Sequence, residues 1–165
     1  MSSSDRRFVL AGLAAGVMTL SGCLRPMLAK GGAASRMRGR IALPRVNDRF
    51  SYFLDESLTA RLGRPGDAEY LLEVSRSLSD RGIAIAQDNA ATRVTLLVTA
   101  KWSLKRLSDV RVMLKDKVEI QSGYNATGSL YATRQVRRDI ERRLARDLGE
   151  RIARVILARA DEALA

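Results

Sequence analysis

The sequence predicts an α+β domain in which two helices pack on one face of a mostly antiparallel four-stranded sheet, as a two-layer sandwich. Three observations lead to this class: residues 69–125 alternate with period two, segments 48–62 and 136–159 have helical spacing, and short polar turns separate the long strands. Short turns join neighbouring strands as a meander, which favours antiparallel pairing.

Local signals place each element of this domain. A short strand at 40–43 ends at Pro44, which has no N–H group for a central ladder. Asn47-Asp48 cap a helix that runs to about Leu62, where the turn at residues 63–66 ends it. We then expect three strands, over residues 70–85 with a bulge at Gly82, 92–105 and 110–124.

The last segment has the clearest helical pattern. One helical stripe is formed by Val136, Ile140, Leu144, Leu148, Ile152, Val155, Ile156 and Arg159. Arginines crowd the other surface: Arg134, Arg137, Arg138, Arg142, Arg143, Arg146, Arg151 and Arg154. Such a face is most often a solvated surface with pairing at three- and four-residue spacings, so for a single arginine this interpretation competes with a binding role.

The N-terminus has the composition of a bacterial export signal. Arg6 and Arg7 form a basic n-region, residues 8–19 an apolar h-region, and Leu20-Ser21-Gly22 a small-residue cleavage site. The apolar run is too short for a stable membrane span. This order predicts a lipoprotein signal peptide over residues 1–22. The general secretory route and the twin-arginine route both stay open, since Asp5 stands where the latter usually has Ser or Thr.

Cys23 is the only cysteine of the chain, and it directly follows this lipobox. We expect its sulfur to carry lipid, because each buried methylene contributes about 0.8 kcal/mol and several acyl chains make attachment lasting. The alternative is an ordinary secretory signal with a chance cysteine. Leu24 replaces the Asp that would retain a lipoprotein at the inner membrane, so we expect a lipid-anchored protein at the outer membrane that faces the periplasm.

About 140 residues remain after the signal, which is enough for one core. Residues 23–37 are rich in Gly, Ala and basic side chains and are predicted to be a lipidated tether, and residues 38–165 a single domain. The domain contains no disulfide, because its only cysteine precedes it. Its stability therefore depends on packing.

The charge of the chain indicates an anionic partner. The formal net charge is +11, and loss of the signal with Asp5, Arg6 and Arg7 lowers it by one unit to +10. In the cytoplasm this charge would indicate nucleic acid. Behind a lipobox the abundant anions are lipid headgroups, above all lipopolysaccharide, and acidic surfaces of envelope proteins, so we expect no nucleic acid.

Catalysis finds little support in the residue types. The chain has no histidine and no free thiol, which removes the commonest general base and the soft metal ligands. The acidic residues are scattered, mostly on helix surfaces, and only a Ser-Lys arrangement stays open. We therefore expect no enzyme, no metal and no cofactor other than the covalent lipid on Cys23.

The order of the segments ends in Tyr124-Asn125-Ala126-Thr127-Gly128-Ser129-Leu130-Tyr131-Ala132-Thr133, which leads into the charged helix. Over about residues 20–160 this order resembles the lipopolysaccharide-assembly lipoprotein family, LptE, in its alphaproteobacterial form. The resemblance implies a lipoprotein without catalytic activity. Such proteins fill the lumen of the LptD-type outer-membrane barrel that inserts lipopolysaccharide, help the barrel to fold and contact the lipid headgroup.

The resemblance also implies candidate residues for lipopolysaccharide binding. Arg134, with Arg138 one turn later, starts the final helix, where the family tends to place a basic residue. Arg93 follows the turn that corresponds by order to the family's barrel-facing loop, although this chain has no aromatic residue at the tip. A third basic group comprises Lys101, Lys105 and Arg106. Trp102, between them, is expected to be a core or barrel-facing aromatic.

Two other functions stay open. A free-standing periplasmic lipoprotein could bind anionic lipid headgroups, and as a carrier of whole lipids it would need an apolar pocket deep enough for acyl chains. A cytoplasmic nucleic-acid binder would keep its first 22 residues and carry no lipid. Labelling of Cys23 with palmitate would exclude the nucleic-acid binder, because that protein carries no lipid.

Overall fold

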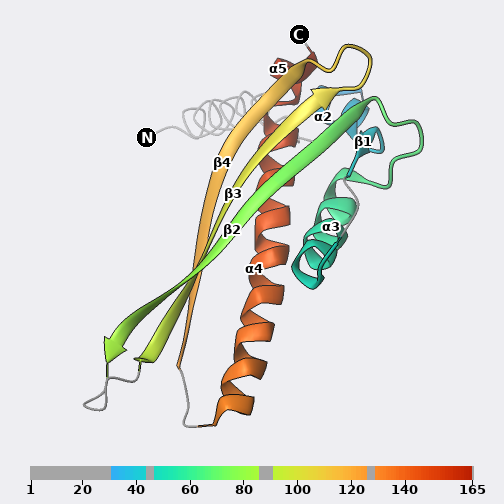
Figure 1. Cartoon of the computed structure of the whole chain (residues 1–165). Helices are drawn as coiled ribbons and strands as arrows, with labels where there is room; N and C mark the ends of the chain where they lie inside the picture. The colour runs from blue at the N-terminus through green and yellow to red at the C-terminus, as the bar shows by residue number, and fades with distance from the viewer. Residues whose placement is uncertain (1–30, 44–46, 86–90, 126–128, 165) are drawn as a thin grey trace, which may run out of the picture.

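Three long strands and one long helix dominate the structure, a computed structural model that describes residues 31–43, 47–85, 91–125 and 129–164. The sheet contains β1 (Ile41–Ala42), β2 (Tyr70–Ile85), β3 (Ala91–Arg106) and β4 (Val112–Asn125), in that spatial order. The helices α2 (Ala33–Met37), α3 (Arg49–Leu62), α4 (Leu130–Ala158) and α5 (Ala160–Leu164) form the second layer (Figure 1). The predicted α+β class is confirmed.

Pairing in the sheet is mixed. β2 pairs with β3 and β3 with β4 in antiparallel register, whereas β1 pairs in parallel with the start of β2. The parallel pair follows from the connection, because α3 lies between β1 and β2 and returns the chain to the same end. The expected irregularity at Gly82 is confirmed by a shift in register between Gly82 and Ala84.

The core lies between the sheet and the long helix. Even-numbered side chains of β3 point to the helices and are buried: Leu96, Val98, Ala100, Trp102 and Leu104. They meet a stripe of α4 that is also fully buried and includes Leu148, Ile152 and Ile156. The alternation of apolar residues along the strands thus correctly predicted which side of the sheet faces the helices.

The tether predicted over residues 23–37 is wrong at its C-terminal end. Residues 33–37 form α2, in which Ala33, Ala34 and Met37 are buried, and this helix contacts α4 and α5. Small side chains are common in linkers, but they also let a short helix approach a core closely. The signal peptide and residues 23–30 of the tether, with Cys23, lie outside the described residues.

The start of the last helix also differs from the prediction. α4 begins at Leu130, one turn before Arg134, because the Ser129 side chain accepts a hydrogen bond from Ala132 N at 3.4 Å and caps the helix. Val136, which we assigned to the apolar stripe, is 40% exposed. The buried stripe of α4 begins at Leu144, so the first third of the helix lies beyond the main core.

Asp48 fixes the start of α3, as the sequence predicted. Its Oδ1 accepts a hydrogen bond from Ser51 N at 2.8 Å, and its Oδ2 pairs with Arg76 of β2. The Arg76 guanidinium also lies 4.4 Å from the centroid of the Phe50 ring. Partial burial alone would raise the pKa of Asp48, but the hydrogen bonds from Ser51 and the charge of Arg76 together lower it below its ordinary 3.8.

Gly149 lets α3 and α4 pack closely. It is buried, and a β-carbon at this position would lie 2.8 Å from Ser57 Cβ, 2.9 Å from Ser57 Oγ and 3.0 Å from Leu54 O. Ser57 Oγ also donates a hydrogen bond to Arg146 O at 2.8 Å. The backbone of α4 at Gly149 therefore lies directly against the Ser57 side chain of α3, and only glycine fits at this position.

Gly149→Ala should destabilise the fold. Overpacking costs about 1–3 kcal/mol, and this exceeds the gain of about 1 kcal/mol that alanine brings to a helix interior. Urea denaturation measures the change in the free energy of unfolding. Ser57→Gly removes the two nearest atoms, so Gly149→Ala should cost less in that background. Equal stability of Gly149→Ala and wild type would contradict the proposed contact.

Asp48→Asn should lower stability only where the carboxyl is ionised. Because the pKa is lower in the folded state, the carboxylate contributes fully above about pH 5, and its contribution is lost as the pH falls through the folded pKa. We expect a deficit of up to about 1 kcal/mol at neutral pH, typical of a half-exposed pair, and none near pH 2. Urea denaturation across this range measures it, with exposed Asp67→Asn as control. A deficit that persists in acid would contradict this charge effect.

Candidate functional site

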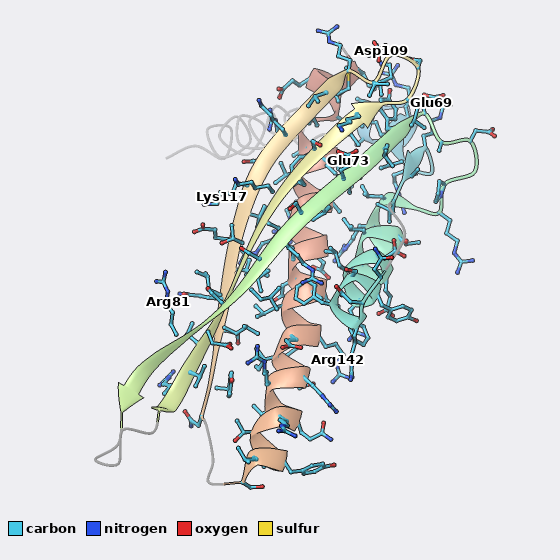
Figure 2. All side chains as sticks on the ribbon, viewed as in Figure 1. Glu69, Glu73, Arg81, Asp109, Lys117 and Arg142 are labelled. Carbon is cyan, nitrogen blue, oxygen red and sulfur yellow. The ribbon has the colours of Figure 1, made fainter. Side chains whose placement is uncertain are left out.

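The face of the sheet that points away from the helices is polar. Odd-numbered side chains of β2, β3 and β4 form it, since successive residues of a strand point to opposite faces. Its uncharged members include Ser75, Ser77, Ser79, Thr95, Thr99, Ser103 and Gln121. Figure 2 shows Arg81 and Lys117 projecting from the side of the sheet away from α4. We call this the outer face.

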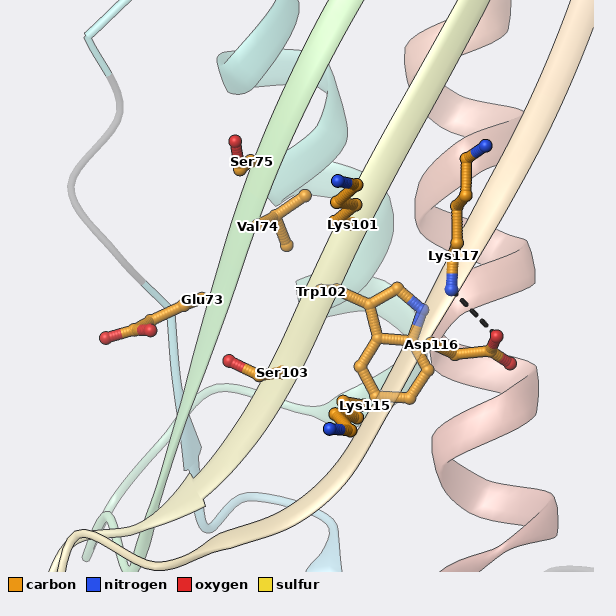
Figure 3. Close-up of a pocket in the computed structure, with 9 residues that line it drawn as sticks. All are labelled: Glu73, Val74, Ser75, Lys101, Trp102, Ser103, Lys115, Asp116 and Lys117. Atoms are coloured by element: carbon orange, nitrogen blue, oxygen red, sulfur yellow. Dashed lines mark hydrogen bonds between the residues drawn. The ribbon is translucent and has the colours of Figure 1, made fainter.

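A shallow depression of about 650 Å³ crosses the middle of the three long strands (Figure 3). Its lining consists of Glu73, Val74, Ser75, Lys101, Trp102, Ser103, Lys115, Asp116 and Lys117. The register places Lys101 directly opposite Lys117, and Ser103 opposite Lys115. The pairing of β3 with β4 therefore gathers three ammonium groups around one depression.

Two of these lysines are available for an external anion. Lys117 Nζ pairs with Glu119 Oε1 at 2.6 Å, and the hydrogen bond and charge of Lys117 lower the pKa of the Glu119 carboxyl. Lys101 and Lys115 make no ion pair with any other described residue, and both are exposed. An anion that reaches the depression therefore meets cationic groups that the sheet itself does not neutralise.

Trp102 contributes to this lining from β3, but its side chain points to the inner face of the sheet. Its side chain belongs to the core and only 3% of the residue is exposed, as expected for one of its two predicted positions. Its indole Nε1 is buried and has no hydrogen-bond partner among the described groups. Because Trp102 is the only tryptophan in the sequence, its fluorescence reports on this part of the sheet alone.

The six predicted basic residues do not form one site. Lys101 lines the depression, whereas Lys105 pairs with Glu73 at 2.6 Å and Arg106 with Asp109 at 3.6 Å, toward the β3–β4 turn. Arg93 lies near the other end of β3, where it pairs with Asn125 of β4. Eight residues separate Arg93 from Lys101, a distance of about 26 Å along the strand.

Arg134 and Arg138 lie on the exposed first third of α4, near the end of β4. Neither forms an ion pair within the described ranges. Other arginines of α4 do: Arg142 and Arg143 pair with Asp139, Arg146 with Glu56, and Arg137 with Glu141 and Asp80. The solvated-surface interpretation therefore fits part of this helix, while Arg134 and Arg138 keep their charge free.

Arg137 joins the first third of α4 to the sheet. Its Nε donates to Glu141 Oε1 at 2.9 Å and its Nη1 to Asp80 Oδ2 of β2 at 2.6 Å. These hydrogen bonds, from Glu141 first and Asp80 second, raise the pKa of the guanidinium further above its already high value. Arg137 therefore acts as a structural tie and stays charged.

Sequence reasoning missed Lys115 and Lys117. Both alternate outward along β4, but their distance from Lys101 depends on the register, which the β3–β4 turn sets. Pairing the two strands across residues 107–111 in the sequence would have placed Lys117 opposite Lys101. The period-two pattern alone could not show this neighbourhood.

No cluster of three or more His, Cys, Asp or Glu residues in the described ranges could hold a metal ion. Among the helices described, none combines the length and the apolar character needed to cross a membrane.

The same arrangement of strands and helices occurs in solved structures of other bacterial proteins. A Caulobacter crescentus protein described as a lipoprotein matches with a TM-score of 0.62 and 20% identity, over 79% of this chain and 96% of that one. This chain shares the fold of that protein. Rare lipoprotein B from Shewanella oneidensis (TM-score 0.58, 12% identity, 72% and 92% coverage) and a minor lipoprotein from Acinetobacter baumannii (0.56, 18%, 72% and 88%) also match.

At these identities the likeness extends to the fold alone. No protein-family model and no curated protein sequence matches the chain. The shared fold covers nearly the whole of each matched structure, so the helix-backed sheet is the common unit.

Proposed function

We propose that this protein is a lipoprotein of the outer membrane that serves as plug and assembly partner of an LptD-type barrel, and so supports transport of lipopolysaccharide to the cell surface. The lipobox at Cys23 supplies the anchor. The matched structures are described as lipoproteins, which supports the same kind of attachment here.

The observation that carries the proposal is the open outer face with its unneutralised lysines. Ammonium groups bind phosphate through charge-assisted hydrogen bonds, and Lys101 and Lys115 form no ion pair with a described carboxylate. Of the two carboxylates in the lining, Glu73 pairs with Lys105, and Asp116 accepts a hydrogen bond from Lys117 N. The depression is wide and shallow, which suits a phosphorylated headgroup. A depression this open does not enclose acyl chains, and this weighs against its use by a free-standing carrier of whole lipids.

The shape and surface of the protein also suit the lumen of a barrel. α4 has 29 residues and is about 44 Å long, which is comparable to the full thickness of a bilayer with its headgroups. Barrel interiors are polar, and the outer face is polar over all three long strands. A plug with such a surface fills a polar lumen without exposing its apolar core.

The direct test is recovery of the partner. Affinity purification from detergent-solubilised outer membranes should bring down one large β-barrel protein, and depletion of this lipoprotein should reduce the amount of folded barrel. Recovery of the lipoprotein alone, with the barrel folded normally after depletion, would contradict the proposal and favour a free-standing binder of headgroups.

Charge reversal should locate the headgroup contact. Lys101→Glu with Lys115→Glu, and separately Arg134→Glu with Arg138→Glu, should each weaken binding of lipopolysaccharide at least about tenfold in low salt, because each pair removes two charge-assisted contacts. Trp102 fluorescence follows binding at the depression, and calorimetry follows both sites.

Arg151→Glu with Arg154→Glu is the matched control, since it makes the same change in charge at two exposed arginines without described ion pairs. A loss of affinity as large in this control would show that only net charge attracts the lipid. Unchanged affinity of the Arg134 and Arg138 variant at low ionic strength would exclude the start of α4 from the contact.

A further inference from the structure

The β3–β4 turn exposes apolar side chains that the fold does not need. Leu107 is 46% exposed, Val110 69% and Val112 45%, and all three lie within six residues. Exposed apolar side chains are common singly, but a cluster on one tight turn indicates a contact with another apolar phase. None of the three belongs to the hydrophobic core of the described residues.

Val110 makes the case stronger because its backbone is unfavourable. Its φ is 56°, a left-handed conformation that a β-branched residue rarely adopts and that Gly or Asn adopts readily. The turn is held in place by neighbours: Asp109 Oδ1 accepts from Arg111 N at 3.2 Å, and Arg106 N donates to Arg111 O at 2.9 Å. The sequence thus keeps a strained valine at an exposed site, which indicates a use for its side chain.

This turn lies at the end of the molecule where the described chain begins. α2 contacts α5, and α5 contacts β4. Figure 1 shows α2, α5 and the turn at one end, and Figure 2 shows Asp109 there; the start of α4 lies at the opposite end. Cys23 precedes Gly31 by eight residues, which span at most about 29 Å when fully extended.

Basic side chains accompany the apolar ones. Arg36, Arg38 and Arg111 are exposed and pair with no carboxylate among the described residues. Acidic groups at this end are partly neutralised, since Glu69 pairs with Arg40, Asp109 with Arg106 and Glu162 with Arg159; Asp67 and Asp161 are not paired. Apolar residues flanked by free arginines suit the headgroup region of an anionic bilayer.

We propose that the β3–β4 turn, through Leu107, Val110 and Val112 with Arg111 beside them, inserts into the surface of the bilayer that holds the lipid of Cys23. The turn is then a second, noncovalent contact that fixes the orientation of the domain on the membrane. This inference rests on the lipid attachment in the proposed function and is independent of the barrel.

A fluorophore next to the turn tests the proposal on the processed, lipidated protein. Because lipid occupies the sulfur of Cys23, an introduced cysteine is the only free thiol. Ser108→Cys leaves the apolar residues of the turn intact, and Ser77→Cys on the outer face is the matched control. Both labelled proteins are reconstituted in vesicles of phosphatidylethanolamine and phosphatidylglycerol, with and without brominated acyl chains.

We expect brominated lipid to quench the probe at position 108 at least twofold more than the probe at 77. Val110→Asn should reduce this quenching at least twofold, and since Asn tolerates the positive φ, the variant should fold as well as the parent. Equal quenching at both positions, or no effect of Val110→Asn, would overturn the proposal. Quenching that requires a co-purified barrel would also overturn it, because it would assign the turn to a protein contact.

Failure of the anchor gives a different result. If the lipid on Cys23 is absent, neither labelled protein floats with the vesicles, and the proposed function fails together with this inference. If both proteins float and the probe at 108 stays accessible to aqueous iodide, attachment stands and only the role of the turn is wrong.

Discussion

The structure depends on the packing of α4 against the inner face of β3 and β4. Leu96, Val98 and Leu104 from the sheet and Ile152 and Ile156 from the helix have no more than a trace of exposed surface. Full burial of side chains of this size contributes about 1.5–3 kcal/mol each, in a domain that has no disulfide. The remaining helices are added to this contact, since α3 packs on α4 and α2 packs on α5 and α4.

This contact divides the molecule into two unlike ends. Toward the C-terminal half of α4 the two layers are closely packed and α2 and α5 cover the core. Toward the start of α4 the helix and the strand ends separate (Figure 1), and Arg137 is the described side chain that pairs with both the helix and β2 there. The proposed membrane contact lies at the packed end, and Arg93, Arg134 and Arg138 lie at the open one.

Much of the fold could be predicted because its signals are local. Period-two alternation gave the strands and their inner face, Asp48 gave the start of α3, and Gly82 gave the bulge. The parallel pairing of β1 and the burial of α2 depend on contacts between distant segments, which composition does not encode. For the same reason Lys101 could be predicted as a candidate, whereas its neighbours Lys115 and Lys117 could not, because only the register brings them close.

Fibril formation is a hazard for any chain that builds long strands. No described strand pairs with the outer edge of β4, whose 14 residues are long enough to template another chain. The middle of that edge carries Lys115, Asp116, Lys117 and Glu119, and copies paired parallel and in register would bring like charges together. Charged residues that line the depression thus also act as gatekeepers against pairing of β4 with another copy of the chain. Replacing them with apolar residues would therefore make aggregation through this edge easier.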